Sequence, residues 1–273
     1  MRAARYAYTA EEREEMRELG LLGADFEQFY VIREFASMLD GADTPEGDYL
    51  LALFQNAARQ DADAFENDPY LRGVKVPETV SGRFRLHYAE YARGEIFQYD
   101  MPDLHARLVV PKLGFFSRPV RFPALYEGSI PWVSVCPSEI HSMEKHIRAA
   151  HGNVLVLGLG LGYYVYRILG AEAVRSVTVV ELSEDVTKLF CEHLMPQFPH
   201  TERLRVVCAD ALAYLPTVKE GQFDFCFADI WEGVTDGAPL YEKIRVHEHR
   251  LPGTRFAYWI EEQIKDRLAL SRK

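Results

Sequence analysis

An apolar run that leads into three closely spaced glycines is the feature that most constrains the fold. Residues 154–157 read Val-Leu-Val-Leu without alternation, which is typical of a strand covered on both faces. The run ends at Gly158, Gly160 and Gly162, where a backbone without Cβ atoms can turn sharply and approach a ligand. A helix beginning near Tyr163 would point its amide dipoles at a polar group of that ligand. We expect a ligand-binding strand–loop–helix unit, with tight packing as the alternative explanation of the glycines.

The spacing of the glycines separates two classes of nucleotide ligand. The dinucleotide fingerprint is G-x-G-x-x-G, whereas residues 158–162 read G-x-G-x-G. Tyr163 stands where the third dinucleotide glycine would fall, and we expect its ring to crowd a pyrophosphate. The pattern therefore favours a nucleoside cofactor without a diphosphate.

Beyond Ser138, strand-like and helix-like segments alternate. This alternation predicts a parallel sheet with helices on both faces, which is a Rossmann-like α/β domain over residues 137–273. In such domains ligands bind at the carboxyl ends of the strands. The predicted strands are 153–157, 176–181, 204–208, 223–228 and 255–260, and the predicted helices are 138–150, 162–170, 183–194, 211–215, 238–250 and 261–270.

Residues 1–136 are expected to form a helical cap followed by short strands. Capping patterns and an apolar stripe predict helices near 9–20, 26–39 and 44–54. From about Ser81 the pattern alternates, with Arg93-Gly94 as a turn between two strands, and prolines interrupt the segment from 102 to 137. We place a domain boundary between residues 136 and 137.

Composition narrows the function classes. The 273 residues are 48% hydrophobic and carry a net charge of -10 without a basic run, which argues against nucleic acid as a partner. The acidic N-terminal segment lacks a signal-peptide pattern, and no apolar stretch reaches the roughly 18 residues that span a bilayer. We expect a cytoplasmic protein without membrane contact.

The cysteines form no CxxC pair, so we expect neither a metal site nor a redox centre. We interpret them as small buried residues in a reducing compartment. They are Cys136, Cys191, Cys208 and Cys226.

Acidic residues follow the second and third predicted strands. Glu181 lies about twenty residues beyond the glycines, where a carboxylate can grip a ribose diol through two hydrogen bonds. Asp210 could accept from an adenine amine while the backbone amide of Ala211 reaches a ring nitrogen. Glu181 could equally be a solvated residue at a helix start, and Asp210 a helix N-cap.

Asp229 and Glu232 follow the fourth predicted strand, so we expect them at the same edge of the sheet. There a substrate would approach the reactive end of the cofactor, and either carboxylate could act as a general base or hold a cationic amine. The structural alternative is that both acids cap the following loop.

Taken together, the four strand-end motifs resemble those of class I S-adenosylmethionine-dependent methyltransferases, and more narrowly the spermidine synthase-like branch. The narrower likeness depends on Val156 before the loop, on the strand 177–182 and on the helix segment 139–143. The resemblance covers roughly residues 138–260 and implies S-adenosylmethionine, or its decarboxylated form, as the cofactor. The implied contacts are Gly158, Gly160, Gly162, Glu181, Asp210, Ala211 and His141, the last of which could also be a helix-surface histidine.

Three departures from the branch bear on its chemistry. Leu161 replaces a loop aspartate that helps to hold the cofactor amine, and the branch's Asp-x-x-Asp ends here in Glu232. Both replacements argue against polyamine synthesis. The sequence also ends soon after the fifth strand, so we expect the usual C-terminal antiparallel hairpin to be absent. The substrate wall would then come from residues 1–136, with Phe122, Tyr126 and Trp132 as candidates that could also be ordinary core aromatics.

These observations predict a methyltransferase that acts on an unidentified small-molecule acceptor, with Asp229 and Glu232 as candidate catalytic residues. The alternatives are a spermidine synthase-like aminopropyltransferase and a non-catalytic protein that binds S-adenosylmethionine. A homodimer is compatible with the sequence.

Overall fold

The computed structural model describes residues 57–105 and 108–271 and divides into two compact units. Of the described residues, one unit contains 57–65, 90–105 and 108–121, and the other contains 66–89 and 122–271. The helices predicted near 9–20, 26–39 and 44–54 lie outside the described residues. The domain boundary between residues 136 and 137 stays a prediction.

The first unit contains a small three-stranded sheet. Its order is β1-β5-β4, with β1 parallel and β4 antiparallel to β5. Aromatic side chains fill its core, where the Phe97 ring lies 4.8 Å from that of Phe116 and stacks on Tyr91 at 4.2 Å. The elements are β1 (Ala58–Gln60), α4 (Ala62–Glu66), β4 (Phe97–His105) and β5 (Leu108–Phe116).

The second unit contains the predicted parallel sheet. Its order is β10-β9-β8-β11-β12, and every neighbouring pair is parallel, which confirms the Rossmann-like α/β fold. In the described part of the chain this sheet has no antiparallel strand. The strands are β8 (Gly152–Leu157), β9 (Val174–Glu181), β10 (Leu204–Cys208), β11 (Phe225–Ala228) and β12 (Arg255–Tyr258).

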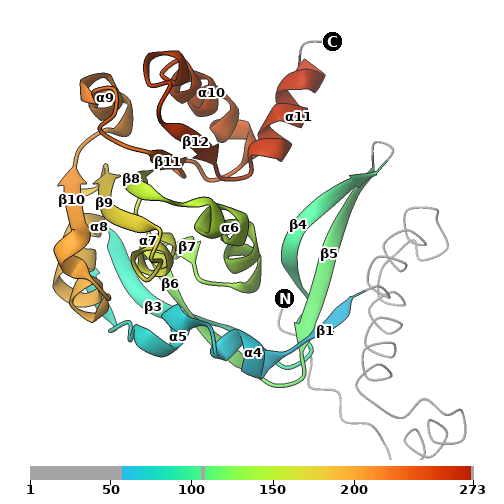
Figure 1. Ribbon diagram of the computed structural model, residues 1–273. Helices are drawn as coiled ribbons and strands as arrows, with labels where there is room; N and C mark the ends of the chain where they lie inside the picture. Colours follow the sequence, from blue (N-terminus) through green and yellow to red (C-terminus); the bar gives the residue numbers. More distant parts are fainter. Residues whose placement is uncertain (1–56, 106–107, 272–273) are drawn as a thin grey trace, which may run out of the picture. The chain divides into compact units, whose positions relative to one another are not determined.

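Helices cover both faces of this sheet. In Figure 1, α6, α7 and α8 lie on one side of the strands, and α9, α10 and α11 lie on the other. The interior strand β11 is therefore buried at every position. The helices are α6 (Pro137–Ala149), α7 (Tyr163–Leu169), α8 (Glu184–Leu189), α9 (Ala211–Tyr214), α10 (Val234–Arg245) and α11 (Glu261–Ser271). Short π or 3-10 turns complete the unit at Phe190–Leu194, Met195–Gln197, Thr201–Arg203, Leu215–Thr217 and Glu248–Arg250.

The interpretation of all four cysteines as buried residues is wrong. Cys136 and Cys226 are buried, whereas Cys191 is only partly buried and Cys208 is exposed. Cys208 is the last residue of β10, which is an edge strand, so its side chain is not covered as those of β11 are.

An antiparallel sheet of order β2-β3-β6-β7 accompanies the parallel one. Val133 of this sheet lies at the glycine loop, since a Cβ on Gly160 would come within 3.3 Å of it. Of the candidate wall residues, Phe122 is buried, Tyr126 is partly buried and Trp132 is exposed. The strands are β2 (Thr79–Ser81), β3 (Phe84–Tyr91), β6 (Val120–Glu127) and β7 (Ile130–Ser134), and the short helix α5 (Pro69–Gly73) precedes them.

Replacing Gly162 with alanine is expected to destabilise the fold by several kcal/mol. Its φ is +75°, and a Cβ there would lie 2.5 Å from the Phe190 ring and 2.9 Å from the Phe198 ring. Gly221 is a matched control, because its φ is +76° but nothing lies within 4 Å of a Cβ. Gly221→Ala should therefore show only the backbone cost, about 1 kcal/mol. Equal losses in the free energy of unfolding, measured with urea, would contradict the packing argument.

Candidate functional site

The glycine loop is shaped by packing as well as by its backbone angles. All three glycines have positive φ, at 95°, 52° and 75° for Gly158, Gly160 and Gly162. A Cβ on Gly158 would collide with the carbonyl oxygen of Asp229. The Gly162 N–H donates to the Leu159 carbonyl at 2.8 Å and closes a turn that has Gly160 at its first central position. Packing thus accounts for Gly158 and Gly162, the alternative that the sequence left open.

The side chain of Tyr163 contacts the α5 segment. Its hydroxyl donates to the Asp68 carboxylate at 3.0 Å, and its ring packs edge-on against Tyr70. The expectation that its ring would crowd a pyrophosphate stays a prediction. Leu161 is also turned inward, with only 2% of its surface exposed.

Glu181 lies where the sequence predicts it, at the end of β9 and beside the loop. One carboxylate oxygen accepts from the Leu159 N–H at 3.0 Å, and the other accepts from the Ser183 N–H at 2.8 Å. Burial raises the pKa of Glu181, and the backbone hydrogen bonds oppose that rise. The carboxylate is therefore held in place before any ligand arrives.

An apolar residue at this edge was missed by the sequence interpretation. Leu182 follows Glu181 directly, and 71% of its surface is exposed although it is a large hydrophobic residue. The Cys208 sulfur lies 3.9 Å from the Leu182 carbonyl, so the ends of β9 and β10 adjoin. A leucine directly after a strand-ending carboxylate was the available signal.

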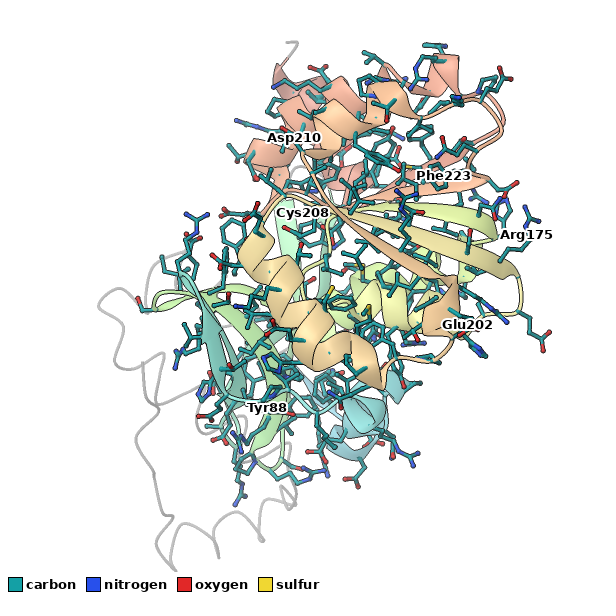
Figure 2. The ribbon with its side chains drawn as sticks, turned by 90° about the vertical axis from the view of Figure 1, so that its left-hand side faces the viewer. Tyr88, Arg175, Glu202, Cys208, Asp210 and Phe223 are labelled. Atoms are coloured by element: carbon teal, nitrogen blue, oxygen red, sulfur yellow. The ribbon has the colours of Figure 1, made fainter. Side chains whose placement is uncertain are left out.

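Asp210 and Ala211 open α9 at the end of β10. The Asp210 carboxylate accepts from the Leu212 N–H at 2.7 Å, so it is the helix N-cap. It is exposed, and Figure 2 shows it near Cys208 at one end of β10, with Glu202 at the opposite end. Ala211 is buried. Adenine recognition by this pair stays a prediction.

The two acidic residues after β11 have different surroundings. Asp229 directly follows β11 and interacts electrostatically with Glu139, in the first turn of α6. Glu232 is exposed, and its backbone N–H donates to Asp236. His141 is exposed on α6. The charge that influences Asp229 is thus that of Glu139, a residue that the sequence interpretation did not nominate.

The surroundings of Glu139 and Asp229, which we call the Glu139–Asp229 pair, favour the protonated form of both carboxyl groups. Burial raises the pKa of Glu139 to about 7, and burial together with the charge of Glu139 raises the pKa of Asp229 well above its ordinary range. Within the described residues no lysine, arginine or histidine forms an ion pair with either carboxyl group. The raised pKa of Glu139 places that carboxyl group where it can exchange a proton near neutral pH.

Glu139→Gln is expected to remove a pH-dependent loss of stability. Because the folded-state pKa of Glu139 is raised to about 7, folding favours its protonated form. The stabilisation of the fold that comes from this preference is fully present below the unfolded-state pKa of about 4.3, and it is lost as the pH rises through about 7. The variant should gain melting temperature relative to wild type at pH 8 and not at pH 4. Glu144→Gln, which removes a carboxylate paired with Arg148 on the same helix, should show no such gain at pH 8.

No helix in the described ranges has the length and apolar character needed to cross a membrane. Among the same residues, no three or more His, Cys, Asp or Glu side chains are grouped as metal ligands would be.

Residues 137–250 match the family model of the spermine/spermidine synthase domain. The resemblance stated from the sequence is thus confirmed for this span. No curated protein matches the chain.

Three solved structures are similar to parts of the chain. Spermidine synthase from Thermotoga maritima is 18% identical, over 67% of this chain and 56% of that one, with a TM-score of 0.37. Precorrin 8W decarboxylase from Methanobacterium thermoautotrophicum is 18% identical over 44% and 61%, with a TM-score of 0.33. A Thermoplasma acidophilum protein provisionally described as a methyltransferase is 25% identical over 40% and 43%, with a TM-score of 0.30. The chain covers less than two thirds of each.

Proposed function

We propose that this protein is an S-adenosylmethionine-dependent methyltransferase acting on a small-molecule acceptor. The observation that carries the choice of methyl over aminopropyl transfer is Leu161. Its side chain is buried in the core, and its carbonyl accepts from the Tyr70 hydroxyl at 2.6 Å. Residue 161 therefore offers no side-chain acceptor for the amine that the decarboxylated cofactor would bring, where the resembling branch has an aspartate.

The residues at the strand ends fit an adenosine group. Glu181 supplies two carboxylate oxygens for a ribose diol, and the exposed Leu182 supplies an apolar surface for a base. Asp210 lies at the end of the adjacent strand and carries an exposed carboxylate. An exposed leucine at a sheet edge that also carries two carboxylates suits a ligand that is flat and apolar on its faces and polar at its edges.

The Glu139–Asp229 pair supplies the proton chemistry. Bound S-adenosylmethionine would supply an electrophilic methyl group, and the protein's task is to position the acceptor and exclude water. A deprotonated Asp229 would take the proton that the acceptor loses, and Glu139 would tune the proton affinity of that carboxylate.

Calorimetric titration with S-adenosylmethionine, decarboxylated S-adenosylmethionine and S-adenosylhomocysteine tests the proposal, followed by methyl transfer to a panel of small acceptors. We expect S-adenosylmethionine and S-adenosylhomocysteine to bind more tightly than the decarboxylated form. If none of the three binds, the proposed function fails.

Aminopropyl transfer is the second candidate, because two carboxyl groups without a cationic partner in the described structure suit a diamine. A preference for the decarboxylated cofactor, with transfer to a diamine, would favour it. Binding of the cofactor without transfer to any acceptor would favour a non-catalytic role.

A further inference from the structure

Hydrogen bonds and an ion pair from Asp68 connect the short helix α5 to α7. The Asp68 side chain caps α5 by accepting from the Tyr70 N–H at 2.8 Å. Its other oxygen accepts from Arg167 at 2.7 Å and from the Tyr163 hydroxyl at 3.0 Å. The Asp68 side chain is only 8% exposed, so this ion pair is shielded from water. The position of α5 is therefore fixed by contacts that do not involve the glycine loop.

A second set of contacts holds the segment that follows α5 in the chain. The backbone N–H of Lys75 donates to the Gln197 side-chain oxygen at 2.8 Å, and the Gln197 amide nitrogen donates to the Lys75 carbonyl at 2.8 Å. These paired hydrogen bonds connect the segment after α5 to the turn at Met195–Gln197. The segment around Tyr70 is thus held at both ends.

From this fixed position Tyr70 reaches into the glycine loop. Its side chain is fully buried, and its hydroxyl donates to the Leu161 carbonyl at 2.6 Å. Burial raises the pKa of Tyr70, so the hydroxyl keeps its proton and acts as a donor. The ring packs edge-on against Tyr166 and Phe198, a role that phenylalanine could fill. What phenylalanine could not supply is the hydrogen bond to the loop.

The hydrogen bond from Tyr70 is accepted by a residue that lies between two glycines of the loop. Leu161 stands between Gly160 and Gly162, whose φ angles of 52° and 75° show that the backbone here uses the freedom of glycine. Without a partner, the buried Leu161 carbonyl would be an unsatisfied acceptor, and the peptide between Leu161 and Gly162 could rotate to relieve it. The hydrogen bond from Tyr70 satisfies the Leu161 carbonyl and so disfavours this rotation.

We propose that Tyr70 is a positioning residue that presets the glycine loop for the part of the cofactor beyond the ribose, the sulfonium and its tail. The proposal rests on the proposed function. The adenosine part would be held by Glu181 and Leu182 at the end of β9. Glu181 contacts the turn at its first residue, through the Leu159 N–H, whereas Tyr70 contacts it at Leu161. Presetting a loop raises affinity by removing the cost of ordering it on binding.

The test compares two ligands and two variants by calorimetric titration. S-adenosylmethionine reaches the loop, whereas 5′-methylthioadenosine carries the adenosine group without the tail. We expect Tyr70→Phe to weaken S-adenosylmethionine binding about tenfold, the loss of one buried hydrogen bond, and to change 5′-methylthioadenosine binding by less than about twofold. Tyr166→Phe is the matched control, because it removes a hydroxyl from the same aromatic cluster and leaves the Tyr70–Leu161 bond in place.

The outcomes are distinguishable. Equal weakening of both ligands by Tyr70→Phe would show a general structural role and overturn the proposal, as would unchanged binding of S-adenosylmethionine. A loss in Tyr166→Phe equal to that in Tyr70→Phe would overturn it as well. If wild type binds 5′-methylthioadenosine but not S-adenosylmethionine or its decarboxylated form, both the proposal and the proposed function fail.

Discussion

Glu181→Ala is expected to weaken the binding of S-adenosylmethionine at least about a hundredfold. In the proposed complex the carboxylate accepts two hydrogen bonds from the ribose diol, and hydrogen bonds to a charged group contribute about 1.5–3 kcal/mol each. The same carboxylate holds the Leu159 N–H at the start of the loop, so the variant also loses a contact that positions the glycines. Calorimetric titration with S-adenosylmethionine and S-adenosylhomocysteine measures both effects.

Glu184→Ala is the matched control for Glu181→Ala. Glu184 is an exposed glutamate in the first turn of α8, three residues further along the chain. Its removal lowers the net negative charge by the same amount, and we expect affinity to stay within about twofold because exposed charges contribute little. Wild-type affinity in Glu181→Ala would contradict the adenosine site. Melting temperatures show whether either variant has lost its fold.

The parallel sheet could be predicted from the sequence because its signals are local. The apolar run of β8, the glycines after it and the carboxylate that ends β9 each lie within a few consecutive residues. The strand predicted at 204–208 coincides with β10, Leu204–Cys208. Such patterns indicate which strand ends meet at one edge, so Glu181 could be placed beside the loop before its hydrogen bond to Leu159 was known.

The contacts that could not be predicted connect distant parts of the chain. Tyr70 and Leu161 are 91 positions apart, and nothing in their local sequence indicates that one hydroxyl meets the other carbonyl. Glu139 and Asp229 interact electrostatically although they belong to segments far apart in the sequence, the first turn of α6 and the residue after β11. The motif segment 139–143 drew attention to His141, which is exposed, because periodicity does not show which helix residue faces a strand end.

Asp229→Asn is expected to lower turnover about 10²- to 10⁴-fold, the range of a lost general base. Asparagine keeps the size of the side chain and cannot accept the proton of the acceptor. Affinity for S-adenosylmethionine, measured by calorimetry, should stay close to wild type because the proposed adenosine contacts are at the ends of β9 and β10. The control is Glu232→Gln, which changes the other acid that follows β11, an exposed residue, and should retain turnover within a few-fold. The reverse pattern would assign the proton transfer to Glu232.

The pH dependence separates a base from a residue that only shapes the site. If a deprotonated Asp229 takes the proton, wild-type turnover should rise with pH as the Glu139–Asp229 pair loses its protons, and the apparent midpoints belong to the pair. Burial is the larger cause of the raised pKa of Asp229, and the charge of Glu139 adds to it. Glu139→Gln removes that charge, so Asp229 should deprotonate at lower pH and the rising limb of the profile should move toward acid. A limb that stays in place in Glu139→Gln would contradict the coupling, and one that persists unchanged in Asp229→Asn would show that another group accepts the proton.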